Sequence, residues 1–194
     1  NAKITGFRFR DKSTGWALRG SMTFDNGETI LFEPEESSYY QMFLSSYTYR
    51  ENCYHCPYAS DHRPGDVSIG DFWGIESVHP ELLAENGGSL DRTWGVSCLF
   101  ANNDKGRILL ERYGKGIHRS KSTYAAAAKH NPQLSAPSVL KPERETVLAL
   151  YRQGYEQVEH WYRKKMLPAL KVRQAIRMAV PKPVKKAIKK ILGR

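Results

Sequence analysis

Residues Arg50 to Ile75 read RENCYHCPYASDHRPGDVSIGDFWGI, and no other part of the chain is as dense in residues with specialised chemistry. The stretch holds a Cys-x-x-Cys pair, a linker rich in turn-forming residues and a Gly-Asp-Phe-Trp-Gly segment. A tight turn brings the two thiolates of such a pair to one side of the backbone, so Cys53 and Cys56 are candidate ligands of one metal. The same spacing also occurs in ordinary thiols, and both interpretations stay open.

The rest of the chain offers few ligands to complete a metal site. His55 lies between the two cysteines and His62 follows them, which allows a mixed Cys/His zinc site. A second ligand pair a dozen or more residues further on, as in common zinc fingers, is missing. The remaining cysteine, Cys98, lies in an apolar run, where a free cysteine usually packs as a small hydrophobe. A four-cysteine cluster therefore cannot be completed from this sequence.

The second half of the stretch predicts a strand followed by a sharp turn. Residues 67–69 alternate between apolar and polar, and we expect Gly70 to adopt a backbone angle that other residues avoid. Asp71 would then lie at the mouth of the turn, followed by Phe72, Trp73 and Gly74. Backbone N–H groups, a carboxylate and aromatic faces suit a flat ligand with a polar edge. The alternative is a packed corner whose aromatic rings belong to the core.

These motifs resemble the C-terminal domain of the beta subunit of coenzyme F420 hydrogenase/dehydrogenase. The resemblance is carried by Arg50-x-x-Cys-x-x-Cys, by Arg63-x-x-Asp66 and by the segment Ile69–Ile75. Further matches, such as Gly15-Trp16 and Asn131-Pro132, occur in order between about Phe7 and His160. The family contains electron-transfer proteins with flavin and iron–sulfur cofactors, and many members are bacterial.

The resemblance implies an oxidoreductase subunit that uses FAD and a 4Fe-4S cluster, with coenzyme F420 as a further candidate cofactor. Its redox partner would be a ferredoxin or another hydrogenase/dehydrogenase subunit. The metal ligands would be Cys53 and Cys56, with the other cluster ligands in an upstream part that we expect to be missing here. The implied cofactor-binding residues are Arg50, Arg63, Asp66, Gly70, Asp71, Phe72, Trp73 and Gly74. No catalytic residue is identified.

A second class of function competes with this one. A non-catalytic interaction domain would use Cys53 and Cys56 to hold a structural metal and would bind no flavin. Its basic tail would then bind a membrane or nucleic acid.

Apolar periodicity predicts an α+β fold. Residues 4–33 read as a β-meander with a hairpin turn at Asp25-Asn26-Gly27, and residues 94–101 predict a buried strand. The loop 77–93 is of the kind that often lies over a ligand site. We expect a mostly antiparallel sheet in the N-terminal half and helices in the C-terminal half, including a long helix from Pro142 to about Met166. The family-like domain would span 1–166 and a basic amphipathic helical tail 167–194.

The net charge of +10 comes from the tail. Residues 171–194 hold nine of the 30 basic residues and no acidic one, which leaves 21 basic against 20 acidic residues elsewhere. The domain itself is thus nearly neutral, which argues against nucleic acid as its partner.

The tail consists of two amphipathic pieces, 172–180 and 184–192, and the pattern is typical of a helix lying on an anionic membrane surface. Packing on a partner chain is the alternative. Three cysteines and the lack of a long apolar run lead us to expect a cytoplasmic protein. The tail leads us to expect that this protein is held at the inner face of the membrane.

Overall fold

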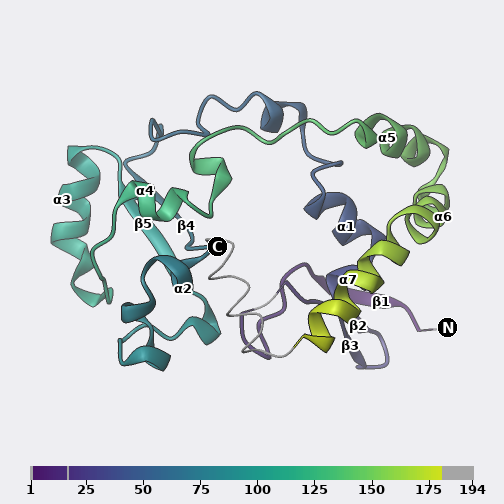
Figure 1. Ribbon diagram of the computed structural model, residues 1–194, viewed down its shortest axis with the longest axis horizontal. Helices are drawn as coiled ribbons and strands as arrows, with labels where there is room; N and C mark the ends of the chain where they lie inside the picture. Colours follow the sequence, from purple (N-terminus) through teal and green to yellow (C-terminus); the bar gives the residue numbers. More distant parts are fainter. Residues whose placement is uncertain (1, 17, 181–194) are drawn as a thin grey trace. The chain divides into compact units, whose positions relative to one another are not determined.

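The computed structural model describes residues 2–16 and 18–180 of the chain (Figure 1). Its contacts divide into two compact units. Unit 1 is formed by the described residues of Asn1–Asp11, Ala17–Thr48 and Leu140–Arg194, and unit 2 by Lys12–Trp16 and Tyr49–Val139. The second amphipathic piece of the tail, 184–192, lies outside the described residues. The sequence-based boundary at residue 166 divides a family-like region from a tail. The two units are divided at other positions, because they are defined by contacts within the fold.

Unit 1 begins with the predicted β-meander. The strands β1 (Ile4–Arg8), β2 (Gly20–Phe24) and β3 (Thr29–Phe32) pair antiparallel in sequence order. The turn at residues 25–27 joins β2 to β3 as expected, and Gly27 takes the positive φ of 83° that such a turn requires. Local turn chemistry therefore fixes the register of this sheet.

The helices of unit 1 are α1 (Ser38–Leu44), α5 (Glu143–Gln153), α6 (Tyr155–Lys165) and α7 (Leu167–Ala179). The expected single helix from Pro142 to Met166 is wrong, because Gly154 divides it with φ 122° and ψ 150°. This conformation is open to glycine and breaks the helical hydrogen-bond ladder. The break lets α5 and α6 pack on one shared core, formed by Met42, Tyr47, Val147, Val158 and Tyr162.

Polar groups of unit 1 connect segments that are far apart in the sequence. The Tyr162 hydroxyl donates a hydrogen bond of 2.6 Å to the Glu35 carbonyl, and the Arg144 guanidinium donates one of 2.7 Å to the Tyr47 carbonyl. The Tyr162 side chain is 1% exposed, and burial raises its pKa to about 12. Burial raises the pKa of other tyrosines of this unit in the same direction, namely Tyr40, Tyr47 and Tyr151.

Unit 2 contains an antiparallel pair of strands, β4 (Val67–Asp71) and β5 (Ser97–Ala101). The helix α3 (Asp104–Tyr113) follows β5, and the Asn103 side chain caps it by accepting a hydrogen bond from the Gly106 N–H. Two short helices, α2 (Ile75–Val78) and α4 (Tyr124–Ala128), complete the unit.

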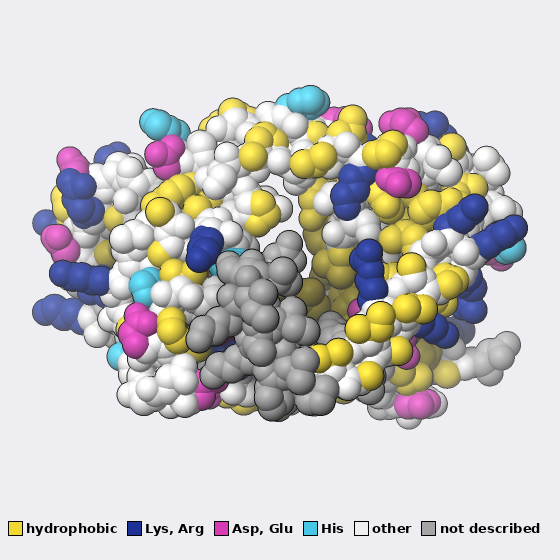
Figure 2. Space-filling model, in the orientation of Figure 1, with side chains coloured by type: hydrophobic (Ala, Val, Ile, Leu, Met, Phe, Trp, Pro, Cys, Tyr) yellow, Lys and Arg dark blue, Asp and Glu magenta, His cyan; other side chains and the backbone are white. Residues whose placement is uncertain are grey.

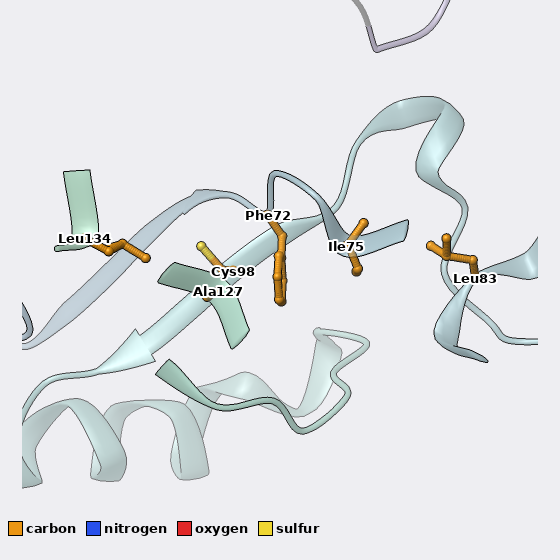
Figure 3. Close-up of a cluster of buried hydrophobic side chains, with 6 residues drawn as sticks. All are labelled: Phe72, Ile75, Leu83, Cys98, Ala127 and Leu134. Atoms are coloured by element: carbon orange, nitrogen blue, oxygen red, sulfur yellow. The ribbon is translucent and has the colours of Figure 1, made fainter. Parts of the chain in front are cut away.

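The core of unit 2 gathers side chains from β4, β5 and the short helices. Figure 3 shows the Phe72 ring between Cys98 of β5 and Ile75 of α2, and Leu83, Ala127 and Leu134 belong to the same cluster. The expected buried strand at 94–101 is only partly correct. Trp94 lies in a 3-10 turn and is 60% exposed, and Cys98 is the buried residue of β5, because the described residues pair β5 with β4 alone.

The α+β prediction is confirmed, with antiparallel sheets in the N-terminal half and helices in the C-terminal half. No helix among residues 2–16 and 18–180 is both long and apolar enough to cross a membrane.

We expect the free energy of unfolding to fall between pH 10 and pH 12, and the substitution Tyr162→Phe to make that fall shallower. In this interval an unfolded chain has released the phenol proton that folded unit 1 still holds at Tyr162, so rising pH favours unfolding. The rise of the Tyr162 pKa from 10.0 to about 12 corresponds to roughly 2 to 3 kcal/mol. Urea denaturation at a series of pH values, followed by circular dichroism, measures the difference.

Tyr39→Phe is the matched control, because it removes another phenol of unit 1 whose side chain is 50% exposed. This variant should keep the wild-type dependence on pH. Near neutral pH, Tyr162→Phe should lose about 1 kcal/mol, since the hydrogen bond to Glu35 is lost. Equal pH dependence in the wild type and Tyr162→Phe would contradict this account.

Candidate functional site

Unit 2 contains two pockets that share Trp73 in their walls. The large pocket has a volume of about 490 Å³ and the small pocket a volume of about 140 Å³. Only the large pocket falls in the range of roughly 300–1,000 Å³ that is usual for small-molecule sites. Its lining includes Trp16, Phe72, Trp73, Gly74, Glu85, Arg92 and Gly95. That of the small pocket includes Arg63, Ser68, Gly70, Asp71, Trp73, Cys98 and Gln133.

The end of β4 positions Trp73. The Phe72 N–H donates a hydrogen bond of 2.8 Å to the Val96 carbonyl, and the Phe72 side chain is 8% exposed in the core. The alternative of a packed corner therefore applies to Phe72, whose ring belongs to the core of unit 2. Trp73 follows it directly and contributes to the walls of both pockets. One residue thus anchors the corner while its neighbour forms the site.

The turn depends on Gly74 and not on Gly70, which corrects the sequence-based expectation. Gly70 lies inside β4, pairs with Cys98 of β5 and is not among the glycines with positive φ. Gly74 has φ 75°, and a Cβ atom there would lie 2.2 Å from the His130 ring. Any side chain at residue 74 would therefore both strain the backbone and collide with His130.

Two tryptophans form the apolar wall of the large pocket. The ring centroids of Trp16 and Trp73 lie 4.4 Å apart with an angle of 50° between the planes. The backbone N–H of Trp16 donates a hydrogen bond of 2.5 Å to the Thr93 carbonyl. This bond joins the segment 12–16 to the loop 77–93. Gly95 leaves space for this wall, because a Cβ atom there would lie 2.5 Å from the Trp16 ring.

Charged residues form the other side of the large pocket. The Arg92 Nε donates to the Glu85 carboxylate at 2.8 Å, and both side chains are 47% exposed. A solvent-exposed ion pair adds little stability, so its importance here is that it holds a cation in the pocket lining. The large pocket thus combines aromatic faces with the Arg92–Glu85 ion pair and a further carboxylate, Glu76, an arrangement that suits a flat ring with a polar edge.

Arg63 gives the small pocket a buried donor. Its Nη2 donates to the Gln133 carbonyl at 3.1 Å, whereas its Nε is buried and has no hydrogen-bond partner among the described residues. Buried donors are nearly always paired in folded proteins, so a ligand acceptor would complete this group.

The Cys98 thiol in the same lining lies 3.4 Å from the Gly70 carbonyl. Burial, the largest effect, raises the pKa of this thiol, although hydrogen bonds to the backbone and the charge of Arg63 act in the opposite direction. The thiol is therefore protonated near neutral pH and is a poor metal ligand or nucleophile in this state. Cys98 belongs to the core, as its apolar sequence context predicts.

The Cys-x-x-Cys pair lies in a 3-10 turn at Glu51–Tyr54 and just after it. The Cys53 N–H donates to the Arg50 carbonyl at 2.9 Å, and the Cys53 carbonyl accepts from the Ser138 N–H at 3.0 Å. Both thiols are partly buried. Arg50, Cys53 and Cys56 line neither of the two pockets.

In the part of the chain that the structure describes, no group of three or more His, Cys, Asp or Glu side chains could hold a metal. The mixed Cys/His zinc site is therefore not assembled from these residues. The His62 side chain is 93% exposed and pairs with its neighbour Asp61 at 2.8 Å. Cys53 and Cys56 are both free thiols.

Asp66 connects β4 to the start of α3. Its carbonyl accepts from the Asn102 N–H at 2.9 Å, and its carboxylate accepts from the Asn103 Nδ2 at 2.8 Å. A Cβ atom at Gly106 would lie 2.0 Å from the same carbonyl oxygen. Asp66 lines neither pocket, and these contacts give it a structural role.

The sequence did not single out several lining residues as site residues. Trp16, Glu85 and Arg92 lie far from Arg50–Ile75 in the sequence, and long-range contacts bring them together. Two signals existed, namely the Gly15-Trp16 match to the family and the expectation that the loop 77–93 lies over a ligand site.

A chain of polar side chains on unit 2 resembles a hydrolytic triad in outline only. The His79 Nε2 lies 2.8 Å from the Ser122 hydroxyl, and the His79 Nδ1 lies 3.0 Å from the Glu81 carboxylate. A backbone hydrogen bond, and secondarily His79, lower the pKa of Glu81. The Glu81 side chain is 64% exposed, and none of the three residues lines either pocket. These hydrogen bonds connect side chains on the surface of unit 2, and the three residues are not part of the candidate site.

Comparisons with protein-family models, with curated proteins and with solved structures found no match to this chain.

Proposed function

We propose that this protein is an electron-transfer oxidoreductase subunit that uses flavin and an iron–sulfur cluster, like the beta subunits of coenzyme F420 hydrogenase/dehydrogenase. One observation carries the proposal: residues of the Arg63 to Gly74 motif line two pockets that share Trp73. Six of the eight residues that the resemblance assigns to cofactor binding line one pocket or both: Arg63, Gly70, Asp71, Phe72, Trp73 and Gly74.

The large pocket is the proposed flavin site. FAD would supply the switch between two-electron hydride chemistry and one-electron transfer. The indoles of Trp16 and Trp73 offer apolar faces to a flat ring system, and the Arg92–Glu85 ion pair supplies polar groups in the same lining. Apolar walls with a few fixed polar groups are typical of cofactor sites.

The small pocket is the proposed site for a polar edge of the same ligand. Its volume of about 140 Å³ is well below the usual range for a whole cofactor. The buried Nε of Arg63 can donate to a carbonyl or anionic oxygen, and the Asp71 carboxylate can accept from a ring N–H. These two side chains would orient the ligand.

Cys53 and Cys56 are the proposed cluster ligands of this chain. Thiolates are the usual ligands of a 4Fe-4S cluster, and Cys53 and Cys56, both free thiols, would be two of the four that it requires. The other two would come from outside the described residues. A ferredoxin or another subunit would be the redox partner, and coenzyme F420 is the candidate substrate at the flavin.

We expect Trp73→Leu to weaken FAD binding by roughly tenfold to a hundredfold, because stacking a planar ring on an aromatic side chain contributes about 1 to 3 kcal/mol. Fluorescence quenching of added FAD and the flavin content of the purified protein measure the effect. Trp94→Leu is the matched control, since Trp94 belongs to the same unit, is 60% exposed and lines neither pocket. The flavin assignment fails if the folded Trp73→Leu protein binds FAD as tightly as the Trp94→Leu protein does.

We expect the double substitution Cys53→Ser, Cys56→Ser to remove iron from protein that is expressed with any sequence preceding residue 1 and purified without oxygen. Iron analysis and the visible absorption spectrum measure the loss. Cys98→Ala should keep its iron, because burial holds that thiol protonated in the core. Full iron content in the double variant would contradict the ligand assignment. Loss of zinc instead of iron would favour the metal-stabilised interaction domain.

A further inference from the structure

The helix α7 of unit 1 carries an apolar stripe that faces solvent. Val172 and Ile176 are 59% and 58% exposed. Small apolar residues with helical spacing extend the stripe in both directions, namely Pro168, Ala169, Ala175 and Ala179, all of them exposed. Residues three or four positions apart lie on one face of a helix, so these side chains form a continuous strip. Figure 2 shows hydrophobic side chains along α7 with Lys and Arg side chains beside them.

The exposed stripe is not needed to pack α7 onto unit 1. Leu167 and Leu170, with Met166 just before the helix, already pack against the core of that unit. A surface helix of a globular protein usually presents polar residues on the side away from its core. In α7 both sides are apolar, and the outer apolar side lacks a partner among the described residues.

Basic residues border the stripe on both sides. Lys171 lies at one edge and Arg173 at the other, by their positions in the helix, and both are exposed. Lys164 and Lys165, also exposed, come directly before α7. No Asp or Glu occurs after Glu159 in the whole sequence. An apolar strip with a cation at each edge matches the chemistry of an anionic lipid surface, which has an acyl layer beneath phosphate groups.

We propose that α7 binds an anionic lipid membrane by lying flat in its surface, with Val172 and Ile176 in the acyl boundary and the flanking Lys and Arg side chains on lipid phosphates. A helix of 13 residues is about 20 Å long, which is shorter than the bilayer core of about 30 Å but suits an in-plane position. The inserted side chains are few, so most of the affinity comes from charge, at about fivefold in dissociation constant for each basic residue at the surface.

Co-sedimentation of the whole chain with phosphatidylcholine vesicles, with and without phosphatidylserine, tests the proposal. Binding should require phosphatidylserine and weaken steeply as salt is added. The triple variant Lys165→Gln, Lys171→Gln, Arg173→Gln should bind roughly a hundredfold more weakly. Ile176→Gln, which removes apolar contact without changing charge, should lower the affinity by about tenfold.

The matched control removes three exposed charges from α3 and the turn after it, in the variant Lys105→Gln, Arg112→Gln, Lys115→Gln. This control has the same net charge as the variant Lys165→Gln, Lys171→Gln, Arg173→Gln and should bind vesicles like the wild type. Circular dichroism confirms that each variant is folded. Equal weakening by both triple variants would overturn the proposal, as would equal binding to neutral and anionic vesicles. Tighter binding to a single-stranded RNA than to phosphatidylserine vesicles would overturn it in favour of nucleic acid.

Discussion

The hydrogen bond from the Phe72 N–H to the Val96 carbonyl, 2.8 Å long, holds the corner on which the candidate site depends. It joins the end of β4 to the segment that enters β5. Phe72 is thereby fixed in the core of unit 2, and the next residue, Trp73, is placed in the walls of both pockets. Gly74 then turns the chain toward α2 in a conformation that any side chain would disturb. A stable core and an open aromatic wall are thus produced by neighbouring residues.

Local signals in the sequence predicted much of the fold because the interactions behind them are local. The hairpin turn at residues 25–27, for example, acts within a few residues. The division of the long helix at Gly154 was missed, because an isolated glycine inside a helical pattern can be tolerated without ending the helix. Gly70 and Gly74 are the same residue type, so the sequence does not show which of them forms the turn. The structure shows it, because Gly70 pairs with Cys98 inside β4 and Gly74 has the positive φ.

The candidate site was partly predictable for a related reason. Arg63, Asp71 and Trp73 belong to one dense motif, so their chemistry was visible in the sequence. Trp16 and Arg92 reach the same large pocket from other parts of the chain, and no local pattern reports such contacts. Asp66 had the right residue type for a ligand, yet its carboxylate pairs with Asn103. Residue type alone does not separate a binding carboxylate from one that joins two elements.

The order in which the two units appear along the chain has a consequence for biosynthesis. Unit 1 is discontinuous, because the core residues Met42 and Tyr47 pack with Val147, Val158 and Tyr162. All of the sequence of unit 2 precedes residue 140, so a ribosome has made it completely before the helices that close unit 1 exist. Until then Met42 and Tyr47 lack the side chains of α5 and α6 that bury them in the folded unit. During synthesis the segment around α1 is therefore open to aggregation and chaperone binding until α5 and α6 have been made.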